Sequence, residues 1–127
     1  MSVRTKRWND PVEPEDGTRI LVCRYRPRGV KREDETWHEW MQELAPSVAL
    51  HAAAYGKEAP TIPFDEYETR YLSEMSRHDH LIAALGGRVH RGETLTLLCS
   101  SACTDAALCH RTLLAGLIRA ASGDDDA

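Results

Sequence analysis

The chain has 127 residues, of which 42% are hydrophobic and 28% charged, the composition of a globular domain rather than a disordered, fibrous or membrane-spanning chain. This length is enough for one domain with its own core, so folding requires neither a disulfide nor a metal. No apolar run approaches the roughly 20 residues of a membrane span, and residues 1–8 lack the apolar segment of a secretory signal. We therefore expect a cytoplasmic protein whose four cysteines are reduced.

Charge is distributed unevenly along the chain. Residues 1–32 hold nine Lys and Arg against four Asp and Glu, a balance of +5, while residues 33–127 carry −9, giving the net charge of −4. The isoelectric point of about 5.8 argues against a nucleic-acid partner, because such domains are usually strongly basic. The basic N-terminal quarter instead suggests a local anion site. We expect one domain over residues 1–121 and a flexible acidic tail over residues 122–127.

Three short segments predict β-strands. Residues 3–8 alternate weakly and end before the turn residue Pro11. Residues 19–23 and 94–99 are mainly apolar without alternation, which is typical of strands that are buried on both faces. Such strands belong to parallel sheets.

Four segments predict helices, namely residues 33–44, 47–56, 63–85 and 104–121. The first has apolar residues at positions i, i+3, i+4 and i+7, which are Trp37, Trp40, Met41 and Leu44. Ser47 is expected to cap the second helix and Gly56 to end it, and Gly86 and Gly87 are expected to end the third. His110 is expected near the centre of the apolar face of the last helix. Short buried strands separated by helices predict an α/β domain with a mainly parallel sheet.

Ligands bind open parallel sheets beyond the carboxyl ends of the strands, and the loop that follows residues 19–23 is strongly basic. It carries five cations in the nine residues 24–32. Guanidinium groups present paired donors in one plane, which suits phosphate and carboxylate. We predict that a small anionic ligand is bound by Arg24, Arg26, Arg28 and Arg111. The alternative is a solvated basic turn.

The loop that follows residues 94–99 holds three cysteines, a histidine and an arginine. A thiol beside an arginine near a helix N-terminus has a depressed pKa and a reactive thiolate. Cys99 and Cys109 are therefore candidate nucleophiles, and His110 is a candidate proton acceptor. The alternative for His110 is a buried neutral histidine that makes one hydrogen bond.

The same residues offer metal ligands, because three thiols and an imidazole suit a tetrahedral zinc site. The spacing C-x3-C-x5-C-H is not a pair of C-x2-C knuckles, and adjacent residues on a helix point about 100° apart, so joint ligation by Cys109 and His110 is awkward. The C-x5-R, C-x-x-C, C-x-x-C-H, P-loop and G-x-G-x-x-G motifs are absent. Cys23 lies inside a buried strand and is interpreted as a small hydrophobic residue.

The chain contains, in this order, Lys6-Arg7, Asp16-Gly17-Thr18-Arg19-Ile20-Leu21-Val22, Pro27-Arg28-Gly29, Glu43-Leu44-Ala45-Pro46-Ser47, Phe64-Asp65-Glu66-Tyr67-Glu68-Thr69-Arg70-Tyr71, Leu97-Leu98-Cys99 and Cys109-His110-Arg111. Together these segments resemble the YeaO-like family, number 488 among the domains of unknown function, over residues 3–120. The resemblance implies a small intracellular α/β protein with a Rossmann-like three-layer core, and it implies no activity. The family usually has aspartate where this chain has Cys23 and tryptophan where it has Arg26. This departure makes Cys23 a candidate for function.

Three functions remain open, in this order of preference. The first is a ligand-binding or catalytic pocket at the carboxyl edge of the sheet. The second is a protein that binds zinc or b-type haem, since thiolate and imidazole are both ligands of haem iron, and a homodimer could enclose such a cofactor. Its candidate ligands are Cys23, Cys99, Cys103, Cys109 and His110. The third is a non-enzymatic interaction module whose basic loop binds an acidic partner.

Overall fold

The computed structural model describes residues 2–56 and 61–123. The strands are β1 (Ser2–Arg7), β2 (Thr18–Leu21), β3 (Glu39–Trp40) and β4 (Thr94–Cys99). The α-helices are α1 (Val48–Tyr55), α2 (Phe64–Met75), α3 (Asp79–His90) and α4 (His110–Ser122). Short 3₁₀ helices cover Pro14–Asp16, Arg32–Asp34, Gln42–Leu44, Ser76–His78 and Ala106–Leu108.

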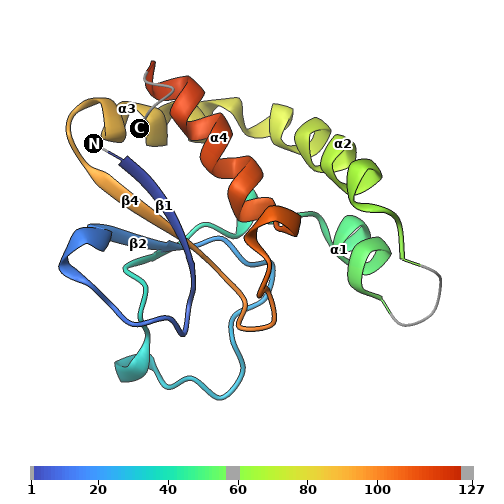
Figure 1. Cartoon of the computed structure of the whole chain (residues 1–127), viewed down its shortest axis with the longest axis horizontal. Helices are drawn as coiled ribbons and strands as arrows, with labels where there is room; N and C mark the ends of the chain where they lie inside the picture. The colour runs from blue at the N-terminus through green and yellow to red at the C-terminus, as the bar shows by residue number, and fades with distance from the viewer. Residues whose placement is uncertain (1, 57–60, 124–127) are drawn as a thin grey trace.

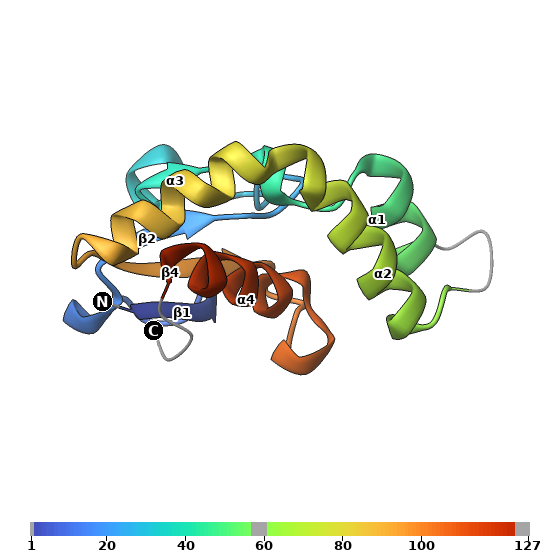
Figure 2. The same ribbon diagram turned by 90° about the horizontal axis from the view of Figure 1, so that it is seen from above.

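The four strands form one parallel sheet in the order β1-β4-β2-β3. Helices α3 and α4 lie over one face of this sheet, and α2 extends past the strands towards α1 (Figures 1 and 2). The other face is covered by the connections that follow β1 and β2, because Trp8 and Trp37 from these connections pack on it. The three layers confirm the predicted α/β class with a parallel sheet.

Strands β2 and β4 are buried on both faces, as the sequence predicts. Ile20 and Leu97 pair across the two strands and pack into the core beneath the helices. The next pair, Leu21 and Leu98, packs into the second apolar cluster on the opposite face. Successive side chains of a strand point to opposite faces, so a strand that is covered on both sides is apolar at consecutive positions.

The predicted helix over residues 33–44 is wrong, because this segment forms two 3₁₀ helices on either side of β3. Trp37 packs edge-on against Trp8, with ring centroids 6.3 Å apart. Trp40, in the edge strand, is 39% exposed and donates a hydrogen bond from its indole N–H to the Cys23 carbonyl oxygen. Aromatic residues favour strands, and here strand pairing and ring packing outweigh the helical spacing.

The second predicted helix is confirmed, with Ser47 Oγ accepting a hydrogen bond from the Leu50 amide at 3.1 Å and Gly56 as its C-cap. The third is interrupted between α2 and α3 by a 3₁₀ turn, and it extends to His90 rather than ending at Gly86. Gly86 lies inside α3 for a packing reason, because a Cβ atom there would come within 2.7 Å of Ala121 in α4. This glycine permits close contact of two helices.

The last helix begins later than predicted. Asp105 caps the short 3₁₀ helix Ala106–Leu108 by accepting a hydrogen bond from the Ala107 amide. Cys109 is then extended, with φ −130° and ψ 141°, so α4 starts at His110. His110 therefore lies in the first turn of α4 and not at its centre, where the sequence places it.

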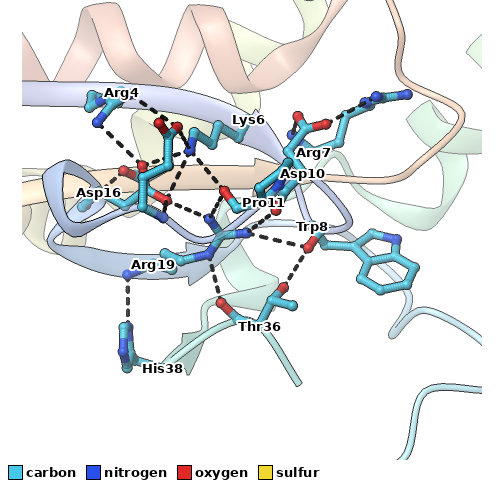
Figure 3. Close-up of polar contacts among 12 residues, drawn as sticks. Arg4, Lys6, Arg7, Trp8, Asp10, Pro11, Asp16, Arg19, Thr36 and His38 are labelled. Carbon is cyan, nitrogen blue, oxygen red and sulfur yellow. Dashed lines mark hydrogen bonds and ion pairs between the residues drawn. The ribbon is translucent and has the colours of Figure 1, made fainter. Parts of the chain in front are cut away.

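The sheet face opposite the helices holds a buried polar network around Arg19 (Figure 3). The Arg19 guanidinium donates to Asp16 Oδ2 at 2.6 Å and to the backbone carbonyls of Thr36, Trp8, Asp10 and Pro11. Because Nε, Nη1 and Nη2 all donate, we interpret this arginine as structural. It joins β2 to the connections that cover this face.

The predicted acidic tail begins inside the domain. Ser122 is the buried last residue of α4, and Gly123 caps the helix with φ 78°. Residues 124–127 of that predicted tail lie outside the described residues. No helix within residues 2–56 and 61–123 has the length and apolar character needed to cross a membrane.

Candidate functional site

A cleft lies beyond the carboxyl ends of β2 and β4, where the sequence predicts ligand binding. Strands β2 and β4 are neighbours, so the two loops that leave them lie at the same edge of the sheet. The cleft has a volume of about 420 Å³, which is in the usual range for small-molecule sites. Its lining residues are Cys23, Arg24, Tyr25, Pro46, His51, Tyr55, Cys99, Ser100, Ala102, Cys103, Thr104, Asp105, Leu108 and His110.

A tight turn after β4 places Cys103 on this cleft. The Cys103 amide donates to the Ser100 carbonyl oxygen at 3.0 Å, and Ser100 Oγ accepts from the Ala102 amide at 3.1 Å. Arg7, at the end of β1, donates to the Ser101 carbonyl oxygen at 3.3 Å. These contacts turn the chain back so that Cys103 lies near the end of β4.

The structure brings the three cysteines of β4 and the segment after it together, with Cys23, which follows the neighbouring strand β2, beside them. The Sγ atoms of Cys99, Cys103 and Cys109 all lie within 4.8 Å of one another. Cys23 belongs to the same apolar cluster, and its thiol faces the Leu98 carbonyl oxygen at 3.9 Å. All four cysteines are free thiols, and only Cys103 is half-buried rather than buried.

The surroundings of the cluster favour ionisation of Cys103 over that of its two neighbours. Hydrogen bonding from the thiols of Cys109 and Cys99 lowers the pKa of Cys103 well below its ordinary value, with help from the nearby Arg111 guanidinium. The same contacts with Cys103 raise the pKa of Cys99 and of Cys109. The half-buried thiol of the cluster is therefore the one whose pKa is lowered, and the pKa values of the two sequence candidates, Cys99 and Cys109, are raised.

Arg111 supplies a buried positive charge beside the turn. Its side chain is 5% exposed, and Nη2 donates to the Cys103 carbonyl oxygen at 3.3 Å. Its Nε and Nη1 groups have no hydrogen-bond partner among the described residues. A buried guanidinium with unpaired donors is costly unless an anion compensates it, and the Cys103 thiolate is close enough to be stabilised by it.

His110 lines the cleft as a neutral imidazole. Its Nε2 lies 2.8 Å from the Val22 carbonyl oxygen. Since a carbonyl can only accept, Nε2 carries the proton and Nδ1 has the free lone pair. Burial lowers the pKa of His110 to about 4. Nδ1 lies 4.0 Å from Cys109 Sγ. From the sequence, these two side chains are expected to point about 100° apart on a helix. Cys109 is extended rather than helical, so this expectation does not apply.

The structure separates the four arginines that the sequence groups as anion ligands. Arg24 lines the cleft, where Nε and Nη2 donate to the carbonyl oxygens of Pro46 and Ala45 at 2.8 and 3.4 Å. Arg26 forms an ion pair with Glu35 at 2.6 Å and lies over the Trp37 ring. Neither Arg26, Arg28 nor Arg111 is among the residues that line the cleft. Of the five cations in the basic loop, Arg24 is thus the one that lines the cleft.

An aromatic wall of the cleft was not predicted from the sequence. It consists of Tyr25, His51 and Tyr55. The His51 ring lies between the two tyrosine rings, with centroids 5.3 Å from Tyr25 and 5.1 Å from Tyr55. Burial and the Arg24 charge lower the pKa of His51, and burial raises the pKa of Tyr55 to about 12. The i, i+4 spacing of His51 and Tyr55 on α1 is the sequence pattern that could have indicated this wall.

The chain is similar to one family model and to several uncharacterised bacterial proteins. A family model described as "Active DUF488-N3 subclade" matches residues 3–122. An uncharacterised protein of Escherichia coli (strain K12), YeaO, is 36% identical over 101 residues, covering 80% of this chain and 84% of that protein. Uncharacterised proteins of Mycobacterium bovis and Mycobacterium tuberculosis are 34% identical over 77 residues, which is 61% of this chain and 61% of each of them. No solved structure matches the chain.

Proposed function

The chain belongs to the YeaO-like DUF488 family, and on that premise we propose that its cleft binds a small anionic ligand on which the Cys103 thiolate acts as a nucleophile. Arg24 binds the anionic group of the ligand. The hydrogen bond from His110 to the Val22 carbonyl oxygen holds the imidazole in place in the lining of the cleft.

One observation carries this proposal, namely the position of Cys103 between the cleft and a set of groups that stabilise negative charge. Cys103 lines the cleft, its sulfur lies within 4.8 Å of two further thiols, and the buried Arg111 contacts its backbone. A thiolate is the reactive form of cysteine. In the reaction the sulfur lone pair forms a bond to an electrophilic atom of the ligand, and the electron pair of the broken bond leaves with the displaced group. Cys99 and Cys109 have raised pKa values, so their thiols stay protonated beside the Cys103 sulfur.

The pH dependence of alkylation tests the proposal. Iodoacetamide reacts with thiolates, releasing iodide, and mass spectrometry of peptides locates each modified cysteine. We expect Cys103 to be modified fastest and well below pH 8.5, the approximate pKa of a free thiol, and we expect Cys103→Ser to remove this fast phase. Cys23→Ser is the matched control and should retain it. A common alkylation midpoint for all four cysteines, near the ordinary value, would overturn the proposal.

A soft-metal site is the second candidate, and the mutual approach of three thiols favours it. A tetrahedral zinc site with Zn–S bonds of about 2.3 Å separates its sulfurs by about 3.8 Å, so the Sγ atoms of Cys99, Cys103 and Cys109, which lie within 4.8 Å, need only a small contraction. Cys23 and His110 are the nearest candidates for a fourth ligand. Arg111 would offset the negative charge of three thiolates.

Metal analysis of the purified protein and titration with Zn²⁺ distinguish this candidate from the first. Bound zinc that is lost in Cys109→Ser but kept in Cys23→Ser, together with protection of Cys103 from alkylation, would favour the metal site. A metal-free protein that does not retain Zn²⁺ and reacts fast at Cys103 would exclude it. The absorption spectrum after addition of haem tests the b-type haem alternative in the same preparation.

A further inference from the structure

The aromatic wall narrows the class of ligand that the cleft can take. We propose that the ligand is a planar aromatic ring that carries an anionic group, with the ring against Tyr25, His51 and Tyr55 and the anionic group at Arg24. This inference rests on the proposed function only in taking the cleft as the binding site. It does not depend on what the cysteines do there.

The rings of the wall are accessible although they are arranged in contact with one another. Tyr25 is 56% exposed and Tyr55 is 51% exposed, and both rings line the cleft on either side of the half-buried His51. Large aromatic side chains contribute most of the binding energy at recognition sites when a partner covers them. Three adjoining rings at one cleft are thus a surface suited to another ring.

Three cysteines line the same cleft as the aromatic wall. These are Cys23, Cys99 and Cys103, and sulfur makes favourable contacts with aromatic rings, worth about 0.3–1.5 kcal/mol each. A planar ring bound in the cleft is therefore offered both aromatic side chains and sulfur atoms. An aliphatic ring of the same size would bury similar area but would gain neither contact.

The charges of the lining residues give the position of the anionic group. Arg24 is the cation among them, since His51 has a lowered pKa and His110 a pKa of about 4. Hydrogen bonds to the Ala45 and Pro46 carbonyls hold the guanidinium in place and leave Nη1 for a ligand. Asp105 lies on the same lining and repels an anion, which directs the anionic group towards Arg24.

Three matched probes test the inference on the wild-type protein. Benzoate has both the ring and the charge, cyclohexanecarboxylate has the charge without the aromatic ring, and benzamide has the ring without the charge. Protein-detected NMR titration measures the dissociation constants and locates the shifts. We expect benzoate to bind about fivefold more tightly than cyclohexanecarboxylate and about tenfold more tightly than benzamide.

Variants assign the two preferences to residues. Tyr25→Leu should abolish the preference for benzoate over cyclohexanecarboxylate, while Tyr25→Phe, which keeps the ring, should retain it. Arg24→Gln should make benzoate and benzamide equal, while Arg28→Gln, in the same basic loop but away from the cleft, should leave the difference unchanged. These tyrosine variants change an exposed residue, so folding is preserved.

The outcomes separate this inference from the proposed function. Equal binding of benzoate and cyclohexanecarboxylate, or absence of benzoate binding, would overturn the aromatic ligand class even if Cys103 alkylates as a thiolate. A clear ring preference with ordinary alkylation of Cys103 would support the ligand class and overturn the nucleophile.

Discussion

The Arg111 guanidinium donates from Nη2 to the Cys103 carbonyl oxygen at 3.3 Å and is otherwise unpaired among the residues that the structure describes. This contact joins the first turn of α4 to the turn that carries the accessible thiol. Because Arg111 is buried, its charge is poorly screened by solvent. It therefore favours the ionised form of a neighbouring thiol.

Replacing Arg111 should move the pH profile of Cys103. In Arg111→Met the apolar stem remains and the charge is lost, so we expect the midpoint of the Cys103 alkylation profile to rise by about one pH unit. Arg111→Lys keeps the charge, so the midpoint of its alkylation profile should lie between those of Arg111→Met and the wild type. The measurement is the iodoacetamide rate at Cys103 against pH.

The remaining groups around Cys103 determine how this result is interpreted. Cys99 and Cys109 also lower the pKa of Cys103, so a profile that moves in Cys109→Ser but not in Arg111→Met would assign thiolate stabilisation to the thiols alone. Arg28→Gln is the charge control, since Arg28 lies outside the cleft lining.

Mild oxidation should link Cys103 to Cys99 or Cys109. Their sulfurs lie within 4.8 Å, and the turn at residues 100–105 can close the remaining distance to an S–S bond of about 2 Å. With diamide, the Cys103 thiolate adds to the N=N bond, which takes up a proton, and the Cys99 or Cys109 thiol then gives up its proton as its sulfur displaces the hydrazine and forms the disulfide. The protein should lose two hydrogen atoms in mass, and peptide mapping should locate the bond.

Two variants control the oxidation experiment. Cys103→Ser should prevent the disulfide, because Cys99 and Cys109 have raised pKa values and lack a ready thiolate. Cys23→Ser should form it as the wild type does. A disulfide that persists in Cys103→Ser would contradict the assignment of the thiolate to Cys103.

The convergence of the cysteines could be predicted from the sequence because it follows from topology. Two buried strands and an intervening helical segment imply parallel strands, and parallel strands end at one edge. The pairing of β2 with β4 then brings Cys23 beside Cys99. The turn that adds Cys103 and Cys109 is local to the same segment, so a short-range pattern was enough.

The aromatic wall and the Arg19 network could not be predicted in this way. The wall depends on how α1 docks against the loop after β2, a contact between Tyr25 and His51 across 26 positions of the sequence. Arg19 looks like the polar end of an apolar run, and its burial requires acceptors from several separate segments. The helix predicted over residues 33–44 is wrong for a similar reason. The conformation of this segment depends on the packing of Trp37 against Trp8, which is distant in the sequence.

A pair of glycine substitutions should have opposite effects on stability. Gly86→Ala places a Cβ atom within 2.7 Å of the Ala121 backbone in α4, so the helices must separate, and we expect a loss of about 1–3 kcal/mol in the free energy of unfolding. Gly116→Ala meets nothing within 4 Å on the exposed side of α4 and should stabilise by up to about 1 kcal/mol. Urea denaturation measures both, and equal effects would contradict the close contact of α3 and α4.

Asp16 should make stability depend on pH in the acid range. It is 1% exposed, contacts Lys6 at 2.8 Å and forms an ion pair with Arg19 at 2.6 Å. Burial alone would raise the pKa of Asp16, but hydrogen bonds from Lys6, the Glu13 amide and Arg19 outweigh it and lower the pKa to about 2. Since the folded pKa lies below the unfolded value of about 3.9, the carboxylate stabilises the fold above that value. Protonation should remove about 2 kcal/mol as the pH falls from about 4 to about 2.

Asp16→Asn isolates this contribution. At neutral pH the variant leaves Arg19 buried without its counter-ion, so we expect it to be about 3 kcal/mol less stable than the wild type in urea denaturation. This difference should narrow by about 2 kcal/mol between about pH 4 and pH 2, because the wild type loses the same charge there. Other carboxylates titrate equally in both proteins and cancel in the difference. Asp34→Asn, at an exposed position, should match the wild type throughout. A difference between Asp16→Asn and the wild type that stays constant as the pH falls would mean that Asp16 stabilises the network by its shape and hydrogen bonds rather than by its charge.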